Sequence, residues 1–297
     1  MSVDTIAAKY IEKRKNGSRR EHIGKLIIHL FLILGSVIMT FPLIWLISSA
    51  FKPSADIFDR NFKMIPETFT LRNFVDGWNI NPQFSFGHFF MNTVVLAVLV
   101  LIGTAVSSSL TAFGFARMKF KYKKLLFTIM LSTMMIPGQV TLIPQYLIFN
   151  RIGWLNSYLP MVVPAFFGGG AFNIFLLIQF IRGIPRELDE SARIEGCSSF
   201  RVYWNIIMPL CKPALFTVVI FTFLGTWNDF MGQLIYLNST EKFTVSLILN
   251  SLIDINSAVS WGPVIALTLL SILPCILLFF VLQPYFVEGI ATTGLKG

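Results

Sequence analysis

The sequence predicts an all-α integral membrane protein that crosses the bilayer six times, and three observations predict this class. Hydrophobic residues make up 55% of the 297 residues and charged residues only 13%, whereas a typical soluble domain carries about 25% charged residues. The mean hydropathy is +0.69. The apolar residues gather in six runs, each of which meets the roughly 20 residues that a helix needs to cross the hydrocarbon core.

The chain begins with a basic, polar leader at residues 1–25, which holds seven Lys or Arg and three Asp or Glu. The apolar run 26–51 is too long for the core of a signal peptide, and nothing after it resembles a small-residue cleavage site. We therefore expect this run to be retained as the first span, with Pro42 inside it. Residues 26–297 are expected to form one six-span transmembrane domain.

A polar segment, 52–88, with four basic and four acidic side chains separates the first span from the second. The second span covers about 89–115 and is rich in Val, Leu, Ala and Ser. The third begins at Leu125 but contains Pro137-Gly138 and then Pro144. Because proline interrupts helical hydrogen bonds, we expect this span to end in a broken segment near the far surface.

Three further spans follow the broken one. The fourth, 158–180, contains Gly168 to Gly170, which predicts a flexible or closely packed point. The fifth covers about 214–237 and the sixth about 262–287, with a mixed loop at 238–261 between them. Six spans place both termini on one side of the membrane.

The distribution of positive charge predicts which side that is. Of the 24 Lys and Arg residues, 18 lie in residues 1–25, the run RMKFKYKK at 117–124, residues 182–212 and the C-terminal tail. The positive-inside rule therefore places both termini and residues 182–212 in the cytoplasm. Since the basic residues flank apolar runs instead of forming one patch, the net charge of +9 does not indicate nucleic-acid binding.

The strongly polar stretch between the fourth and fifth spans, 182–213, predicts two short helices that meet at Gly196. Pro185 suits the first helical position, and a glycine commonly follows the last helical turn. The helix dipole favours negative charge on the first turn, where three carboxylates lie: Glu187, Asp189 and Glu190. A narrow apolar stripe recurs every four residues: Ile184, Leu188 and Ala192.

The second helix is expected to begin at Ser199, a suitable N-cap, and to close at Pro209, with Pro213 opening the next span. Its apolar residues have helical spacing and comprise Phe200, Tyr203, Trp204 and Ile207. Two amphipathic helices joined at a glycine predict a rigid, protruding elbow, and we keep this name for residues 182–213. Such an elbow is suited to binding a partner protein; the alternative is a polar connector between two spans.

A spaced pattern runs through the elbow: Glu190-Ser191-Ala192, then Gly196, then Ile206-x-Met208-Pro209. It resembles the EAA loop of binding-protein-dependent ABC transporter permeases, although Ser191 and Met208 depart from the family's alanine and leucine. In that family the loop is the coupling helix and sits in a cleft of a cytoplasmic ATPase subunit. The resemblance implies that the docking residues are Glu187, Glu190, Ser191, Ala192, Gly196, Arg201 and Pro209.

The resemblance covers nearly the whole chain and points to the carbohydrate branch of the family. The segments that carry it are 90–93, 112–127, 135–144, 227–230, 285–290 and 294–297. The C-terminal segments are similar to the tail of the maltose-type permease that pairs as the second, smaller membrane subunit.

This resemblance implies the six-helix fold of type I ABC importers, a bacterial cell membrane, and import of a sugar or oligosaccharide coupled to ATPase closure through residues 185–209. The implied partners are a second, related permease subunit in a heterodimer, two cytoplasmic ATPase subunits and an extracytoplasmic solute-binding protein. A permease for a polyol or glycerol phosphate is an alternative. An ion-driven secondary transporter is another, although such proteins usually carry several ionisable residues in their spans.

The residues do not predict an enzyme. The sequence has no G-x4-G-K-[ST] motif, and Gly24-Lys25 is followed by Leu26, so ATP phosphates are not bound in that way. We expect ATP and Mg²⁺ on the partner ATPase subunits, and no cofactor or metal in this chain. The three histidines are expected to be solvated or interfacial, and Cys197 and Cys211 to be reduced thiols without a role.

Polar residues in the fifth span are candidates for the solute pathway. Asp229 is the fourteenth residue of an apolar run that begins at Phe216, and an ionised Asp near the bilayer centre costs about 2.5–3.5 kcal/mol. Asp229 should therefore face the bundle or a wet cavity, with Asn228 and Gln233 nearby on the same helix. These side chains either contact a polyhydroxylated solute or make hydrogen bonds that fix the packing of this span.

The loop at 238–261 lies on the extracytoplasmic side by the charge distribution. The resemblance to maltose-type permeases implies that it contacts the docked binding protein, with Asn250, Asp254 and Asn256 as the candidate residues. The alternative is a passive connector.

Overall fold

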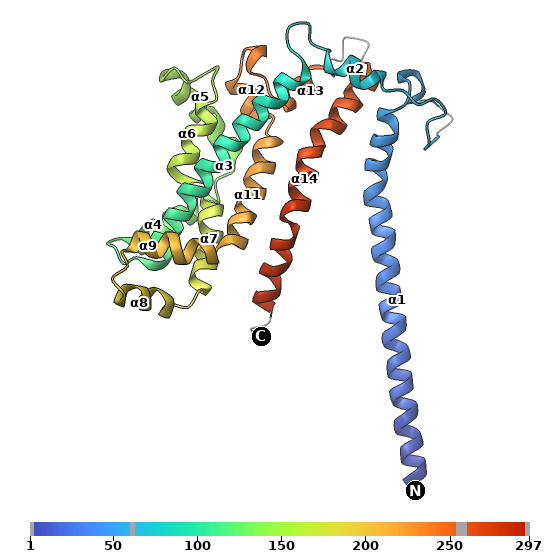
Figure 1. The fold of residues 1–297 in the computed structure, drawn as a ribbon, viewed down its shortest axis with the longest axis vertical. Coiled ribbons are helices and arrows are strands. Elements are labelled where there is room, and N and C mark those ends of the chain that lie inside the picture. The colour runs from blue at the N-terminus through green and yellow to red at the C-terminus, as the bar shows by residue number, and fades with distance from the viewer. Residues whose placement is uncertain (1–2, 60–62, 254–259, 295–297) are drawn as a thin grey trace.

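The computed structural model describes residues 3–59, 63–253 and 260–294, with side chains placed for 24–59, 63–253 and 260–284. In these ranges all the regular elements are helices, which confirms the predicted all-α class. Figure 1 shows that the start of α1 (Val3–Ala50), the end of α14 (Trp261–Gly294) and the short helix α8 (Glu187–Ile194) all lie towards the lower end of the molecule.

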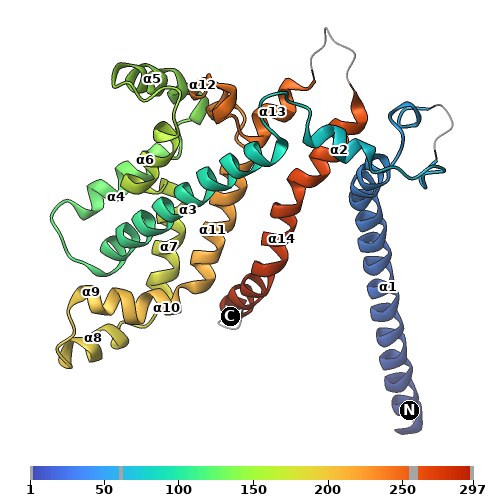
Figure 2. The same ribbon diagram turned by 45° about the horizontal axis from the view of Figure 1, so that its top comes forward.

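Helix α1 stands apart from the other helices over most of its length (Figures 1 and 2). It runs without a break from the basic leader through Pro42. Its apolar part, Gly24–Ala50, has no buried residue in its membrane-length window. Only its C-terminal end packs, where Ala50 joins a cluster with Ile265 and Ala266 of α14. Most of α1 therefore presents an apolar surface that the described part of the chain leaves uncovered.

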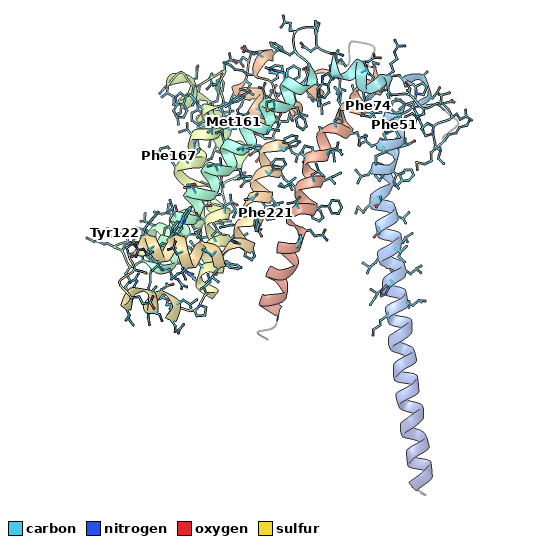
Figure 3. All side chains as sticks on the ribbon, viewed as in Figure 1. Phe51, Phe74, Tyr122, Met161, Phe167 and Phe221 are labelled. Atoms are coloured by element: carbon cyan, nitrogen blue, oxygen red, sulfur yellow. The ribbon has the colours of Figure 1, made fainter. Side chains whose placement is uncertain are left out.

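Two short elements, η1 (Ser54–Asp56) and α2 (Arg72–Trp78), cover the end of α1. The buried Asn73 amide donates hydrogen bonds to the carbonyl oxygen of Ala50 (2.9 Å), an acceptor that the end of the helix leaves unpaired, and to that of Lys52 (2.7 Å) just beyond the helix. The rings of Phe51 and Phe74 meet beside them at 5.1 Å (Figure 3). This cap fixes the connection between α1 and the helices that follow.

Helix α3 (Phe86–Arg117) lies at the centre and packs against α6 (Leu159–Gly168), α7 (Ala171–Gly183) and α11 (Lys212–Trp227). Small buried residues on α3 allow close approach: Gly103, Thr104, Ser107, Ser108 and Ala112. At Gly103 an added Cβ would lie 2.6 Å from the Phe166 ring. The serine-rich composition of the second predicted span therefore serves helix packing.

Two of the predicted irregularities are confirmed. The third span breaks at Pro137, where α4 (Lys123–Thr133) and α5 (Gly138–Arg151) meet at 100°, while Pro144 lies inside α5 without ending it. The fourth span breaks between α6 and α7, where Gly169 and Gly170 have φ of 57° and 81°. A Cβ on Gly169 would lie 2.8 Å from that of Ser108, so the glycine allows both the turn and the contact with α3.

The fifth predicted span, 214–237, is not one continuous helix. Helix α11 ends at Trp227, and α12 (Met231–Tyr236) begins after a break. The physical reason is the Asp229 side chain, which accepts a hydrogen bond from the Gly232 backbone N–H at 3.0 Å. An Asp that bonds to the backbone in this way competes with the helical hydrogen bonds and starts a new helix.

Among the described residues, four helices are long and apolar enough to cross a membrane, and the number reaches six if each of two bent helix pairs counts as one span. The number agrees with the prediction, but the second bent pair is unexpected. It joins α9 (Ser199–Val202), η2 (Tyr203–Ile207) and α10 (Met208–Leu210) of the elbow to α11 at 78°. The predicted loop 238–261 also contains helical turns: η3 (Thr240–Lys242) and α13 (Val245–Ser251).

The largest apolar core joins the elbow to the spans. Its buried members come from the C-terminal half of α3, from α7, from the elbow and from the start of α11, and they include Phe113, Leu177, Ile181, Tyr203 and Ile207. The elbow is therefore packed onto the helix bundle and is not a free loop.

Candidate functional site

The elbow consists of two helical segments joined at Gly196, as the sequence predicts. Gly196 has φ of 84°, in the left-handed region, and its N–H bonds to the Arg193 carbonyl oxygen at 3.0 Å. The caps differ by one or two residues from the prediction. Helix α8 starts at Glu187, after Pro185, and Ser198, not Ser199, caps the second segment by accepting a hydrogen bond from the Arg201 N–H.

The predicted apolar faces are only partly buried. Ile184 and Ala192 lie in the core, whereas Leu188 is 43% exposed. In the second segment Tyr203 and Ile207 are buried, but Phe200 and Trp204 are 67% and 63% exposed. Phe200 and Trp204 are four residues apart, as are Tyr203 and Ile207, so each pair shares one side of the segment. Only the side with Tyr203 and Ile207 faces the core, and these residues bound a π-helical turn.

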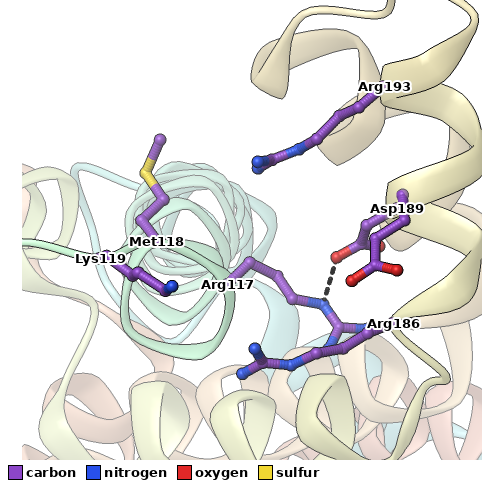
Figure 4. A pocket seen from close by; sticks show the side chains of 7 residues that line it. Arg117, Met118, Lys119, Arg186, Asp189 and Arg193 are labelled. Atoms are coloured by element: carbon purple, nitrogen blue, oxygen red, sulfur yellow. Dashed lines mark ion pairs between the residues drawn. The ribbon is translucent and has the colours of Figure 1, made fainter.

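A buried ion pair fastens α8 to the bundle. The Nε of Arg117, the last residue of α3, lies 2.8 Å from Oδ2 of Asp189, and the two side chains are 2% and 10% exposed. The Nη2 of Arg117 also donates to the Ile184 carbonyl oxygen at 2.7 Å. Figure 4 shows Arg117 extending from α3 towards Asp189. Neither residue belongs to the predicted docking set.

A second polar contact fastens the other half of the elbow. The hydroxyl oxygens of Ser109 on α3 and Tyr203 lie 2.8 Å apart, and both residues are buried. Nearby, burial raises the pKa of the Cys211 thiol to about 12, against the opposing effect of the Arg117 charge. Cys211 is therefore a protonated, buried thiol at neutral pH, as expected for a residue that serves packing.

A cleft of about 410 Å³ opens beside the ion pair, between the end of α3 and α8. Its rim carries Lys119, Arg186 and Arg193, together with Glu190. None of these three basic side chains forms an ion pair within the described ranges, and Figure 4 shows them spread around the opening. The cleft is thus a positively charged, open surface.

Most of the predicted docking residues are on the outside of the elbow. Six of them are exposed: Glu187, Glu190, Ser191, Gly196, Arg201 and Pro209. Ala192 differs, because it is buried in the core beneath α8. The outer face of the elbow is therefore available to a partner, and Ala192 supports that face from below.

The three pathway candidates lie at the break between α11 and α12 and not on one helix. Asn228 is exposed and donates to the Leu224 carbonyl oxygen at 2.9 Å. Asp229 is half-buried. Gln233 is fully buried, donates to the Thr226 carbonyl oxygen at 2.9 Å and accepts from the Thr244 hydroxyl. Gln233 therefore joins α12 to the following loop in this conformation, and Asn228 is the most accessible of the three.

Of the binding-protein candidates, Asn250 is exposed on the last turn of α13, while Asp254 and Asn256 lie outside the described residues. The loop before α13 is firmly attached. Asn92 of α3 donates to the carbonyl oxygens of Glu241 (2.8 Å) and Phe243 (2.9 Å), and a His88 ring nitrogen lies 2.6 Å from the Glu241 oxygen. His88 is thus partly buried and bonded to this turn.

Asn156 attaches the same turn from the other side. Its φ is 55°, and its side-chain oxygen accepts from the N–H groups of Asn238 (3.2 Å) and Ser239 (3.0 Å). Lys242 donates to the Asn156 carbonyl oxygen at 2.7 Å. The sequence did not predict this attachment. The signal was weak, because it consisted of an Asn in a short turn, where Asn suits the left-handed conformation. Within the described ranges, no group of three His, Cys, Asp or Glu side chains is placed to hold a metal ion.

Comparison with known proteins gives a consistent result. The family described as binding-protein-dependent transport system inner membrane component matches residues 107–291. The probable ABC transporter permease protein YurM of Bacillus subtilis is 32% identical over 295 residues, which cover 99% of this chain and 96% of that protein. The arabinooligosaccharides transport system permease protein AraQ of the same organism is 30% identical, with 93% and 97% covered.

A third relative is the trehalose/maltose transport system permease protein MalG of Thermococcus litoralis, 28% identical with 94% of this chain and 99% of that protein covered. Among solved structures, a chain of a bacterial ABC transporter that imports the acidic polysaccharide alginate superposes with a TM-score of 0.81. Its sequence identity is 21%, over 90% of this chain and 98% of that one. This likeness shows the fold.

Proposed function

Because the chain belongs to the binding-protein-dependent transport system inner membrane component family, we propose that it is the permease subunit through which an ATP-driven importer carries a sugar or oligosaccharide. The family makes it a multi-pass membrane component of an ABC transporter and not an enzyme. The observation that supports coupling to an ATPase is the geometry of the elbow. Its outer face is exposed, while its inner face is attached to α3 through Arg117 and Ser109.

The elbow docks in a cleft of a cytoplasmic ATPase subunit. Its exposed polar residues, Glu187, Glu190, Ser191 and Arg201, make the contact, and the left-handed Gly196 keeps the two segments at a fixed angle. The elbow lies towards the same end of the molecule as the start of α1 and the end of α14 (Figure 1), which agrees with the cytoplasmic placement that the basic residues favour. ATP and Mg²⁺ bind to the two ATPase subunits and not to this chain.

A second, related permease subunit completes the membrane part. Helix α1 supports this, because the described part of the chain leaves most of its apolar surface exposed to solvent or lipid. An apolar helix tolerates lipid on all sides, but a helix held away from its own bundle (Figure 2) is placed to pack against another chain. The alternate opening of the pathway then takes place between the two permease subunits. The elbow drives it by binding the ATPase differently in the two states.

The cargo is a sugar or oligosaccharide. Relatives over nearly the whole chain are named for arabinooligosaccharides, trehalose/maltose and galactooligosaccharides. Asn228 and Asp229 lie at a helix break, where polar side chains and backbone are available to hydroxyl groups. An extracytoplasmic binding protein delivers the cargo and docks near Asn250. A solved alginate transporter in complex with a pentasaccharide-bound periplasmic protein offers a parallel; its chain superposes with a TM-score of 0.63.

The test is transport by the complete complex in proteoliposomes, with its ATPase, partner permease and binding protein. Uptake of radiolabelled maltose, arabino-oligosaccharides, galacto-oligosaccharides and glycerol 3-phosphate is compared with ATP inside and with a proton gradient alone. We expect uptake of one of the sugars only with ATP and the binding protein. Uptake driven by the proton gradient without ATP would identify a secondary transporter, and uptake of glycerol 3-phosphate alone would move the cargo outside the sugars.

A further inference from the structure

Helix α8 has few contacts that fix its position. It lies between two joints, the extended residue Ile184 at the end of α7 and the left-handed Gly196. Of the other helices, α9 has the broadest contact with it. Its buried side chains are Asp189 and Ala192, while Leu188 of its predicted apolar stripe is exposed. One alanine provides little apolar burial, so the orientation of α8 depends on Asp189.

Asp189 in turn depends on Arg117. Its Oδ2 lies 2.8 Å from the Arg117 Nε. Both this Nε and the Asp189 Oδ1 are buried without a hydrogen-bond partner in the described part of the chain, so the contact is an attraction between charges. A buried carboxylate without a cation is strongly disfavoured. The other basic residues at the cleft, Lys119, Arg186 and Arg193, are exposed and make no ion pair with Asp189. The pair is therefore specific to one residue of α3.

The guanidinium also holds the joint in front of α8. While Nε faces Asp189, Nη2 bonds to the Ile184 carbonyl oxygen at 2.7 Å. One side chain thus contacts both the joint and the first turn of α8, and so fixes the start of this helix against α3. Arg117 terminates α3, the helix that packs against α6, α7 and α11. A displacement of α8 is transmitted through this residue to the centre of the bundle.

We propose that Arg117 and Asp189 form a latch that makes the elbow and α3 move as one rigid body when the ATPase subunits close. Arg117 and Asp189 are positioning residues, since they touch neither the cargo nor ATP. The proposal rests on the function proposed above, because it needs an ATPase that moves the elbow. A latch differs from a purely structural ion pair in one respect: breaking it lets α8 change its orientation relative to α3 between transport states.

The experiment measures that orientation in the complete complex. Nitroxide spin labels are placed on Ile194→Cys at the exposed end of α8 and on Leu110→Cys at an exposed position of α3, after replacement of the three native cysteines by alanine. Electron–electron distance distributions are recorded without nucleotide and with ATP trapped by vanadate. With the latch intact, we expect one narrow distribution that is the same in both states.

The latch is then broken by Arg117→Gln and, separately, by Asp189→Asn. We expect the distance distribution to shift or broaden on vanadate trapping, and uptake per ATP hydrolysed to fall about tenfold, within the range of coupling energies. The double variant Arg117→Asp with Asp189→Arg restores the pair and should recover the narrow, state-independent distribution. Recovery in the double variant separates the latch from simple loss of folded protein.

Three results would overturn the latch. In the first, the intact protein itself changes its distance between the two states. In the second, Arg117→Gln keeps a narrow, unchanged distribution and normal uptake. In the third, the single variants fail to assemble while the double variant assembles with a mobile α8. Failure of the proposed function would give a different result from failure of the latch, because the unmodified permease would then bind no ATPase.

Discussion

The hydroxyl oxygens of Ser109 and Tyr203 lie 2.8 Å apart inside the protein and join the central helix α3 to the π-helical turn of the elbow. The Tyr203 ring also packs edge-on against Phe113 of α3, with 5.4 Å between ring centroids. Together with the Arg117–Asp189 pair, this contact attaches the two halves of the elbow separately to one helix. The elbow is therefore held by α3 as well as by its own chain connections.

The first prediction concerns this hydroxyl contact. Tyr203→Phe keeps the ring and removes the hydrogen bond, so we expect the free energy of unfolding to fall by about 0.5–1.5 kcal/mol. The lower end is favoured because Ser109 also donates to the Val106 carbonyl oxygen at 3.1 Å. Thermal unfolding of the purified complex measures the change. Trp204→Phe, at the neighbouring exposed position, is the matched control, and an equal shift in both variants would argue against a specific role for the Tyr203 hydroxyl.

The second prediction concerns the joint of the elbow. Gly196 has φ of 84° and no atom within 4 Å of an added Cβ, so substitution acts through the backbone and not through a clash. For a β-branched residue this conformation costs roughly 1–2 kcal/mol. We expect Gly196→Val to be inserted normally while uptake per ATP hydrolysed falls.

The control for the joint is Gly183→Ala at the end of α7, which has equal space around its Cβ and no positive φ. It should behave like the unmodified protein. If Gly196→Val transports as efficiently as Gly183→Ala, the angle between the two segments is not needed for coupling.

The third prediction concerns ATPase binding. Glu190 is exposed on α8, and Glu190→Lys reverses its charge on the outer face of the elbow. Because a rim charge acts on association and on partner choice, we expect less ATPase to co-purify, with a larger deficit at low salt. Glu195→Lys makes the same charge change at the residue that follows Ile194, the last residue of α8, and Glu195 is not among the proposed contact residues. Equal loss of ATPase in both variants would indicate a general charge effect.

The features of the fold that depend on local sequence were predictable. Apolar runs, the Pro137 break and the Gly169–Gly170 break follow from length and backbone chemistry. The left-handed Gly196 follows for the same reason. These features need no knowledge of what packs against them, which is why composition and spacing were sufficient.

The features that depend on contacts between distant segments were not predictable. In the sequence, Arg117 is one of several positive charges at the end of a span, and Asp189 is one of several carboxylates at the start of a helix. The two residues pair because α3 and α8 meet, which the sequence does not reveal. The π-helical turn at Tyr203–Ile207 likewise depends on packing in the core. One local feature was also missed: Asp229 was placed inside a helix, because the hydrogen bond that its side chain accepts from the Gly232 N–H leaves no mark in the hydropathy.

The last prediction separates the two roles of the residues at the break between α11 and α12. If this break faces the pathway, Asn228→Cys and Asp229→Cys should react with a membrane-impermeant maleimide, and the labelling should change when the ATPase is trapped with ATP and vanadate. Gln233→Cys is the matched control, because its position is fully buried and bonded to Thr226 and Thr244, and it should stay unreactive in both states.

A packing role gives a different pattern. Asp229 holds the start of α12 through its bond to the Gly232 N–H, and asparagine offers the same acceptor. Asp229→Asn should then keep its stability, whereas Asp229→Ala should lose about 1 kcal/mol, as for a lost helix cap. The Asn228→Cys and Asp229→Cys variants would then be as unreactive towards the maleimide as Gln233→Cys. The Asn228 side chain is exposed and its hydrogen bond is local, so we expect the pathway role at this position, and state-dependent labelling of Asn228→Cys is the decisive measurement.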